Sequence, residues 1–196
     1  GTLRSTWLSF ISEVAWRVPD KPARMLAQFS QTERGSSYDM LAAAELTETR
    51  ELRRKYLEHA LDEAKHSRMF RDLSLSLGIN REHAALIDIG YLSQHGIVGG
   101  ETLFERLGEL DFLAFVHDAE TRGLELFNVY RDRKLPNETT LAALDIIAKD
   151  EYFHMSYSGA QLDVYRSQGR QKEPARAALG CGGDGRQPPG AIDIGA

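Results

Sequence analysis

The chain has 196 residues, of which 42% are hydrophobic and 27% charged, and its formal net charge is −5. This length and composition are typical of one globular domain with a sizeable core. The acidic balance argues against a nucleic-acid partner, for which a basic surface is expected. The single cysteine, Cys181, excludes an intrachain disulfide and a cysteine-rich metal site. It fits a reducing compartment, so we expect a cytoplasmic protein. No apolar run approaches the ~18 residues of a transmembrane helix.

Apolar residues recur at helical spacing along most of the chain, which predicts an all-α protein. A short amphipathic helix is expected over 3–18 and is predicted to pack on the main bundle through its apolar stripe. A dimer contact or a membrane-surface contact is the alternative use of that stripe. The stripe consists of Leu3, Trp7, Phe10, Ile11, Val14 and Val18. The next helix spans 22–46, and a third follows a cap at Thr47 or Thr49 and ends near Leu77.

Residues 78–100 form a long connection that contains several glycines and only a weak apolar pattern. Such a connection can run the length of a bundle and make the next helix parallel to the previous one. Two further helices are predicted, over 101–133 and 139–167, and Asn137 or Thr139 can cap the second.

These elements predict a four-helix bundle with one long crossover and a short N-terminal helix, forming a single domain over 1–167. Residues 168–196 contain many glycines and prolines and little periodic apolar pattern. We therefore expect an irregular C-terminal tail rather than a second domain.

The pattern D-E-x-x-H occurs twice, at 62–66 and at 150–154. Positions i and i+3 of a helix lie on one face. Each copy therefore directs a carboxylate and an imidazole toward the same point, and two copies that face each other across a bundle could hold two metal ions.

A lone glutamate lies in the middle of the apolar stripe of each of the other two long helices. Glu33 lies 30 residues before Glu63, and Glu120 lies 31 before Glu151. In antiparallel helices joined by a short turn, this separation brings mid-helix residues level. The candidate metal ligands are Glu33, Glu63, His66, Glu120, Glu151 and His154. Four carboxylates balance two divalent cations, and an oxygen-rich set with two imidazoles suits iron or manganese better than zinc.

Asp62 and Asp150 directly precede the motif glutamates. Because a metal-bound histidine normally donates its other N–H to a carboxylate or carbonyl, we expect Asp150 to orient His66 and Asp62 to orient His154 across the bundle. Solvent-facing aspartates are the alternative.

Two further histidines, His59 and His117, lie about one turn before Glu63 and Glu120. We expect them to be core histidines, with a role as extra or supporting ligands as the alternative. The side chains that could line an apolar substrate channel, or simply pack in the core, are Phe29, Phe70, Leu124 and Phe127.

At these residues the sequence resembles the ferritin-like superfamily of di-iron carboxylate proteins, over about residues 22–167. The resemblance implies a ferritin-like four-helix bundle in which two iron ions are bridged by glutamates that match Glu63 and Glu151. Manganese, or one ion of each metal, is the alternative pair. Rubrerythrin-type peroxidases in this superfamily usually have a further glutamate where this chain has Gly123, and true ferritins generally lack the second E-x-x-H.

The two-histidine site looks more like the oxygen-activating members. The resemblance thus implies an O2-dependent di-iron oxidase or oxygenase that oxidises a small, apolar or bundle-bound substrate. It also implies an external electron donor and no catalytic residue beyond the metal ligands, and it is compatible with a homodimer. The alternatives are an erythrin-like peroxide scavenger, an iron-handling or storage protein, and a purely structural metal site.

Overall fold

The computed structural model describes residues 2–79 and 100–170, with side chains from Ser9 onward. These residues form five helices and no strand, which confirms the predicted all-α class. The helices are α1 (Thr2–Arg17), α2 (Lys21–Leu46), α3 (Arg50–Ser76), α6 (Leu103–Asp132) and α7 (Glu138–Ser167). Their ends lie close to the predicted ones. Most of the crossover connection and the tail beyond Arg170 lie outside the described residues, as does Cys181.

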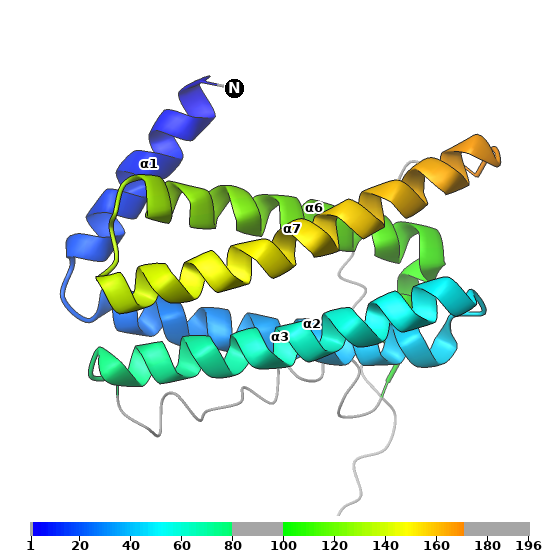
Figure 1. The fold of residues 1–196 in the computed structure, drawn as a ribbon, viewed down its shortest axis with the longest axis horizontal. Coiled ribbons are helices and arrows are strands. Elements are labelled where there is room, and N and C mark those ends of the chain that lie inside the picture. Colours follow the sequence, from blue (N-terminus) through cyan, green and yellow to red (C-terminus); the bar gives the residue numbers. More distant parts are fainter. Residues whose placement is uncertain (1, 80–99, 171–196) are drawn as a thin grey trace, which may run out of the picture.

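The four long helices form two hairpins, because α2 packs along α3 and α6 packs along α7. Contacts between the hairpins are sparser. Figure 1 shows that α3 and α6 run in the same direction, as do α2 and α7. A parallel α3 and α6 is what the predicted crossover requires, since the chain has to return to the other end of the bundle before α6 begins.

Side-chain caps explain where α6 and α7 begin. The Thr102 hydroxyl accepts a hydrogen bond from the Glu105 amide, and the Glu105 carboxylate accepts one from the Thr102 amide. This reciprocal pair satisfies two amides that the first turn leaves unbonded. The Asn137 side chain accepts a hydrogen bond from the Thr140 amide, so Asn137, and not Thr139, caps α7.

The helix predicted over 101–133 is present as α6 but contains one non-helical residue. Gly108 has φ 72° and ψ 163° and kinks α6 near its start. A residue with a Cβ rarely adopts this conformation. The kink separates the capped first turns of α6 from the long segment that lies along α7.

The core consists of two apolar clusters with polar side chains between them. One cluster is built around Tyr56, Phe112 and Leu113, and the other around Phe70 and Leu144. All five of these side chains have a relative exposure of 0%. The middle of the bundle is thereby enclosed on both sides, which places the polar centre away from solvent.

The prediction for the N-terminal helix is wrong in its orientation. Phe10, Ile11, Val14 and Val18 on its apolar stripe are largely exposed, whereas its opposite face is buried at Ser9, Ser12 and Ala15. The helix is held on the bundle near its C-terminal end, where the rings of Trp16 and Tyr130 meet edge to face at 5.4 Å. Among the described residues, no helix has the combined length and apolar character that crossing a bilayer requires.

The two clusters make a matched pair of substitutions informative. Leu144 is fully buried, whereas Leu61 on the outer face of α3 is 71% exposed. We expect Leu144→Ala to lower the free energy of unfolding by about 2–5 kcal/mol, because it leaves a cavity in the core. Leu61→Ala should change it by no more than about 0.5 kcal/mol. Chemical denaturation of the metal-free protein measures both, and equal losses would contradict the described packing.

Candidate metal centre

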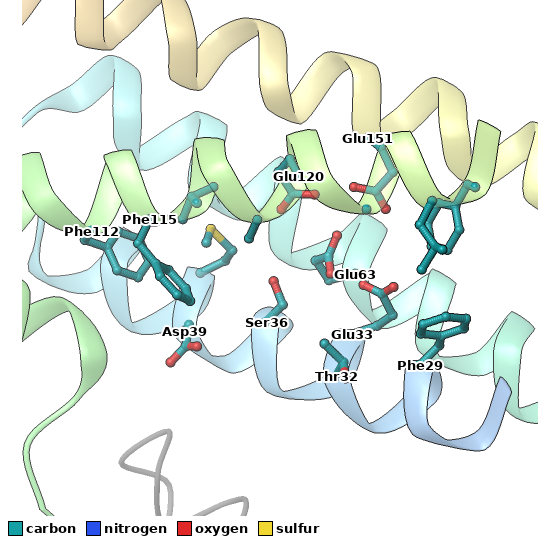
Figure 2. Close-up of a pocket in the computed structure, with 16 residues that line it drawn as sticks. Phe29, Thr32, Glu33, Ser36, Asp39, Glu63, Phe112, Phe115, Glu120 and Glu151 are labelled. Carbon is teal, nitrogen blue, oxygen red and sulfur yellow. The ribbon is translucent and has the colours of Figure 1, made fainter. Parts of the chain in front are cut away.

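Each of the four long helices places one glutamate at the middle of the bundle. Glu33 comes from α2, Glu63 from α3, Glu120 from α6 and Glu151 from α7, and Figure 2 shows the four carboxylates directed toward one another. Glu63, Glu120 and Glu151 are buried, and Glu33 is half-buried. The helical spacing that predicted these positions therefore brings all four side chains into one space.

The two motif histidines contact the carboxylates of both α3 and α7. His66 Nδ1 lies 3.6 Å from Glu63 Oε1 and 3.2 Å from Glu151 Oε1. His154 Nδ1 lies 3.5 Å from an oxygen of each of the same two glutamates. Glu63 and Glu151 thus lie between the two imidazoles, while Glu33 shares a hydrogen bond with Glu63 and Glu120 shares one with Glu151.

The opposite nitrogen of each histidine faces the aspartate of the other motif. His66 Nε2 lies 3.0 Å from Asp150 Oδ2, and His154 Nε2 lies 3.4 Å from Asp62 Oδ2. These are the two cross-bundle pairs expected from the sequence. The hydrogen bond to His154 is the main cause that lowers the pKa of Asp62 to about 2.

Lys65 joins the two aspartates, a contact that the sequence analysis missed. Its Nζ donates to Asp62 Oδ1 at 2.9 Å and to Asp150 Oδ2 at 2.6 Å. All three side chains are partly exposed, so this ion-paired group closes the histidine side of the centre toward solvent. The sequence gives no signal for this contact, because a lysine near acidic residues is common on the surface of a helix.

His59 also lies in the centre, contrary to the expectation of an ordinary core histidine. Its Nε2 lies 3.2 Å from Glu120 Oε1 and 3.4 Å from Glu63 Oε1. Its ring stacks on that of His154 at a centroid distance of 3.5 Å. His117 keeps the expected structural role, because its Nδ1 lies 3.1 Å from both Met155 O and Ser158 Oγ.

The donor atoms form two overlapping groups, and within each group all of them lie within 4.8 Å of one another. One group contains Glu33, Glu63, His66 and Glu151, and the other contains His59, Glu63, Glu120 and His154. Two ligand atoms that each lie about 2.1 Å from one ion are roughly 3.0–3.4 Å apart. The measured separations of 3.2–3.6 Å between the histidine nitrogens and the carboxylate oxygens are close to this spacing.

Several donor atoms in the centre are buried without a hydrogen-bond partner. They are His59 Nε2, Glu63 Oε1, His66 Nδ1, Glu151 Oε2 and His154 Nδ1. A buried polar atom without a partner costs on the order of 1–3 kcal/mol. Five such atoms around one point are therefore well explained as metal-ligating atoms, and the residues present fit a pair of divalent ions.

In the metal-free protein, the pKa values of two of the four glutamates are raised and those of the other two are lowered. Burial, followed by the charge of Glu63, raises the pKa of Glu33 well above its ordinary value. Burial and the charge of Glu151 do the same for Glu120. Burial alone would also raise the pKa of Glu63 and Glu151. A hydrogen bond from Glu33, together with nearby histidines, instead lowers the pKa of Glu63 well below its usual range. A hydrogen bond from Glu120, again with nearby histidines, lowers the pKa of Glu151 to about 2.

The histidines supply the compensating positive charge. Burial alone would lower the pKa of His66, but the carboxylates of Glu151 and Glu63 raise it to about 10. Burial likewise opposes the charge on His59, and Tyr157 and the carboxylates of Glu120 and Glu63 raise its pKa well above the ordinary value. The surroundings of the metal-free centre therefore favour protons on Glu33, Glu120, His59 and His66 over protons on Glu63 and Glu151.

A cavity of about 240 Å³ opens on the carboxylate side of the centre, between α2 and α6. Figure 2 shows Phe112 and Phe115 at one end of it, the four carboxylates near its middle and Phe29 at the other end. None of the histidines in the described residues lines it. The cavity is mostly apolar, with four carboxylates near its middle and Asp39 toward the end where Phe112 and Phe115 lie.

Two of the four predicted channel residues, Phe29 and Phe127, line this cavity. Phe70 does not line it and instead packs in the core, with ring centroids 5.3 Å from Phe29 and 5.7 Å from Phe127. Leu124 faces a different surface hollow. Phe112, Phe115 and Leu126 also line the cavity, although the sequence analysis did not single them out.

No protein-family model, curated protein or solved structure matches this chain. The assignment of the centre therefore rests on its own geometry.

Metal uptake should release protons, because Glu33, Glu120, His59 and His66 all have raised pKa values. We therefore expect a net release of protons when two divalent ions bind at pH 7. The apparent metal affinity should accordingly rise between pH 6 and pH 8, since protons compete less as pH increases. A pH indicator in weakly buffered protein during anaerobic titration measures the release. Binding without proton release would contradict this description.

The cross-bundle aspartates allow a second test. Asp150→Ala or Asp62→Ala removes the group that faces a histidine nitrogen, and we expect metal affinity to fall by about 10–100-fold. Asp118→Ala is the matched control, because Asp118 is exposed on α6 and does not belong to either donor group. Competition with a chelator measures the affinities. If all three variants bind like the parent protein, the aspartates do not support the histidines.

Proposed function

We propose that this protein is a di-metal carboxylate oxidoreductase of the ferritin-like type, which holds two iron ions and oxidises a small apolar substrate with O2. The observation that supports this most strongly is the convergence of four glutamates and the motif histidines, with buried unpartnered donor atoms, beside an apolar cavity. Placing four carboxylates together in the interior lowers the stability of a bundle unless cations or protons offset their charge.

The arrangement of the donors suggests a role for each glutamate. Glu63 and Glu151 lie against both motif histidines, so they are placed to bridge the two ions. Glu33 and Glu120 contact one donor group each and are placed as terminal ligands. Four carboxylates balance the charge of two divalent ions, and the mixture of oxygen and imidazole donors favours iron or manganese.

The arrangement of the helices that present these ligands also supports the ferritin-like proposal. Two helix hairpins lie together with α3 parallel to α6, and each contributes one lone glutamate and one D-E-x-x-H motif. A di-metal bundle with glutamates from two helices and Glu-x-x-His from the other two is a known solution to holding such a site.

Bound iron would supply the reduction of O2 and the oxidation of the substrate. In an oxygenase reaction, one oxygen atom enters a substrate C–H bond and the other forms water, which uses two electrons and two protons from outside. The aromatic walls of the cavity would hold the substrate and exclude water. Glu33 borders the cavity, so as a terminal ligand its carboxylate would lie beside a substrate held there.

Gly123 also favours substrate oxidation over peroxide scavenging. It lines the cavity, and a Cβ built there would meet no atom within 4 Å. The position where an erythrin-like protein would be expected to hold a further carboxylate thus provides open space beside the centre.

Metal stoichiometry and oxidant preference test the proposal together. We expect anaerobically loaded protein to hold about two Fe(II) per chain and to be reoxidised by O2 at least as readily as by H2O2. Glu63→Ala and Glu151→Ala should each lose the paired site. Glu125→Ala should keep it, because Glu125 lies on the exposed face of α6.

Iron analysis and stopped-flow absorbance measure these properties. Three results would contradict the proposal: full iron occupancy in either bridging variant, strong preference for peroxide, or iron accumulating far beyond two ions per chain.

A further inference from the structure

We propose that His59 is a seventh metal donor and that it makes the two metal positions unequal. The position formed by His59, His154 and Glu120 would bind its ion first and more tightly, and the position formed by Glu33 and His66 would bind second. This inference rests on the proposed di-metal function and goes beyond it, because a six-ligand centre with one imidazole per ion would be nearly symmetric.

The geometry of His59 is that of a ligand. The side chain is fully buried, and its Nε2 makes no hydrogen bond although Glu120 Oε1 and Glu63 Oε1 lie 3.2 and 3.4 Å away. These separations match two donors on one ion better than a well-formed hydrogen bond. The stacked ring of His154 holds the His59 imidazole in this orientation.

The other nitrogen of His59 has a partner that fits this role. Its Nδ1 lies 2.9 Å from Tyr157 Oη. A proton on Nδ1, donated to the tyrosine oxygen, leaves the lone pair of Nε2 directed at Glu63 and Glu120. Metal-bound histidines typically have their second nitrogen bonded in this way.

Comparison of the two motif helices shows that the fold does not require a histidine here. The residue four positions before the motif glutamate is His59 in α3 but Ile147 in α7. The residue three positions after the motif histidine is Met69 in α3 but Tyr157 in α7. Ile147 and Met69 belong to the same apolar cluster. Equivalent positions of the two motif helices therefore hold a polar pair, His59 and Tyr157, in one case and an apolar pair, Ile147 and Met69, in the other.

His117 shows that spacing alone does not produce this arrangement. It lies one turn before Glu120, but its Nδ1 faces Met155 O and Ser158 Oγ on α7. Gly159 makes room for its ring, because a Cβ there would lie 3.0 Å from His117 Cε1. His117 is thus a half-buried histidine outside both donor groups and provides a control.

Unequal donors imply unequal metal preference. Imidazole favours later first-row metals such as iron and cobalt over manganese, whereas carboxylates accept manganese readily. The position with two imidazoles would therefore select iron over manganese more strongly than the position with one. Metal-poor protein should contain singly loaded centres with the ion beside His59.

Titration of the metal-free protein with Co(II) alone, followed by visible absorbance, tests the assignment. We expect two binding steps whose dissociation constants differ by at least about tenfold. X-ray absorption at one equivalent should detect two imidazoles on the ion. His59→Leu should weaken the first step by about tenfold or more and reduce the imidazole count to one. His117→Leu should leave both steps unchanged.

The possible results separate this inference from the proposed function. If the parent protein binds no Co(II), both fail. If it binds two ions and His59→Leu leaves both steps and the imidazole count intact, the di-metal centre stands and the His59 assignment is overturned. If circular dichroism shows that His59→Leu does not fold, Tyr157→Phe decides the question, because it removes the Nδ1 partner and keeps the ring. Tyr157→Phe should weaken the first step alone, and an unchanged titration would overturn the assignment.

Discussion

Four carboxylates share the middle of this bundle, and the cost of burying them there constrains the rest of the structure. Glu63, Glu120 and Glu151 are buried and Glu33 is half-buried, so together they would bring four negative charges into a poorly solvated space. In the metal-free chain, raised pKa values favour protons on two of the glutamates and on nearby imidazoles. Two divalent ions would supply the same positive charge and would also give partners to the unbonded donor atoms. Protonation and metal binding would therefore each offset the negative charge of the four carboxylates.

The two apolar clusters fix the positions of the helices that carry the glutamates. They lie on either side of the centre and hold α3 against α2 and α7 against α6, so the glutamates are presented from rigid helices rather than from loops. The ion-paired group of Asp62, Lys65 and Asp150 links the two hairpins outside the histidines. Each imidazole consequently has one nitrogen fixed by an aspartate from the opposite hairpin and the other directed inward.

Helical periodicity was sufficient to predict the helices, their inward stripes and the meeting of Glu33, Glu63, Glu120 and Glu151, because these depend on spacing along single helices. The pairing of each histidine with the opposite aspartate followed from the repeat itself. Features that depend on helix rotation and on neighbouring side chains were not predictable in this way. Periodicity identified the apolar stripe of α1 but not that it faces outward. His59 and His117 have nearly the same spacing from a glutamate, but they contact different groups of α7. His59 contacts the Tyr157 hydroxyl and lies in the centre, whereas His117 contacts Met155 O and lies outside it.

The cavity lies on the α2 and α6 side of the carboxylates, whereas the histidines lie on the α3 and α7 side. The aromatic residues that shape the cavity and the histidines of the centre therefore lie on different walls of the bundle, while the four glutamates border the cavity. Substitutions at Phe112, Phe115 or Leu126 could reshape the cavity without touching an imidazole or its aspartate. A scaffold divided in this way can change the shape of its cavity while the surroundings of its histidines stay the same.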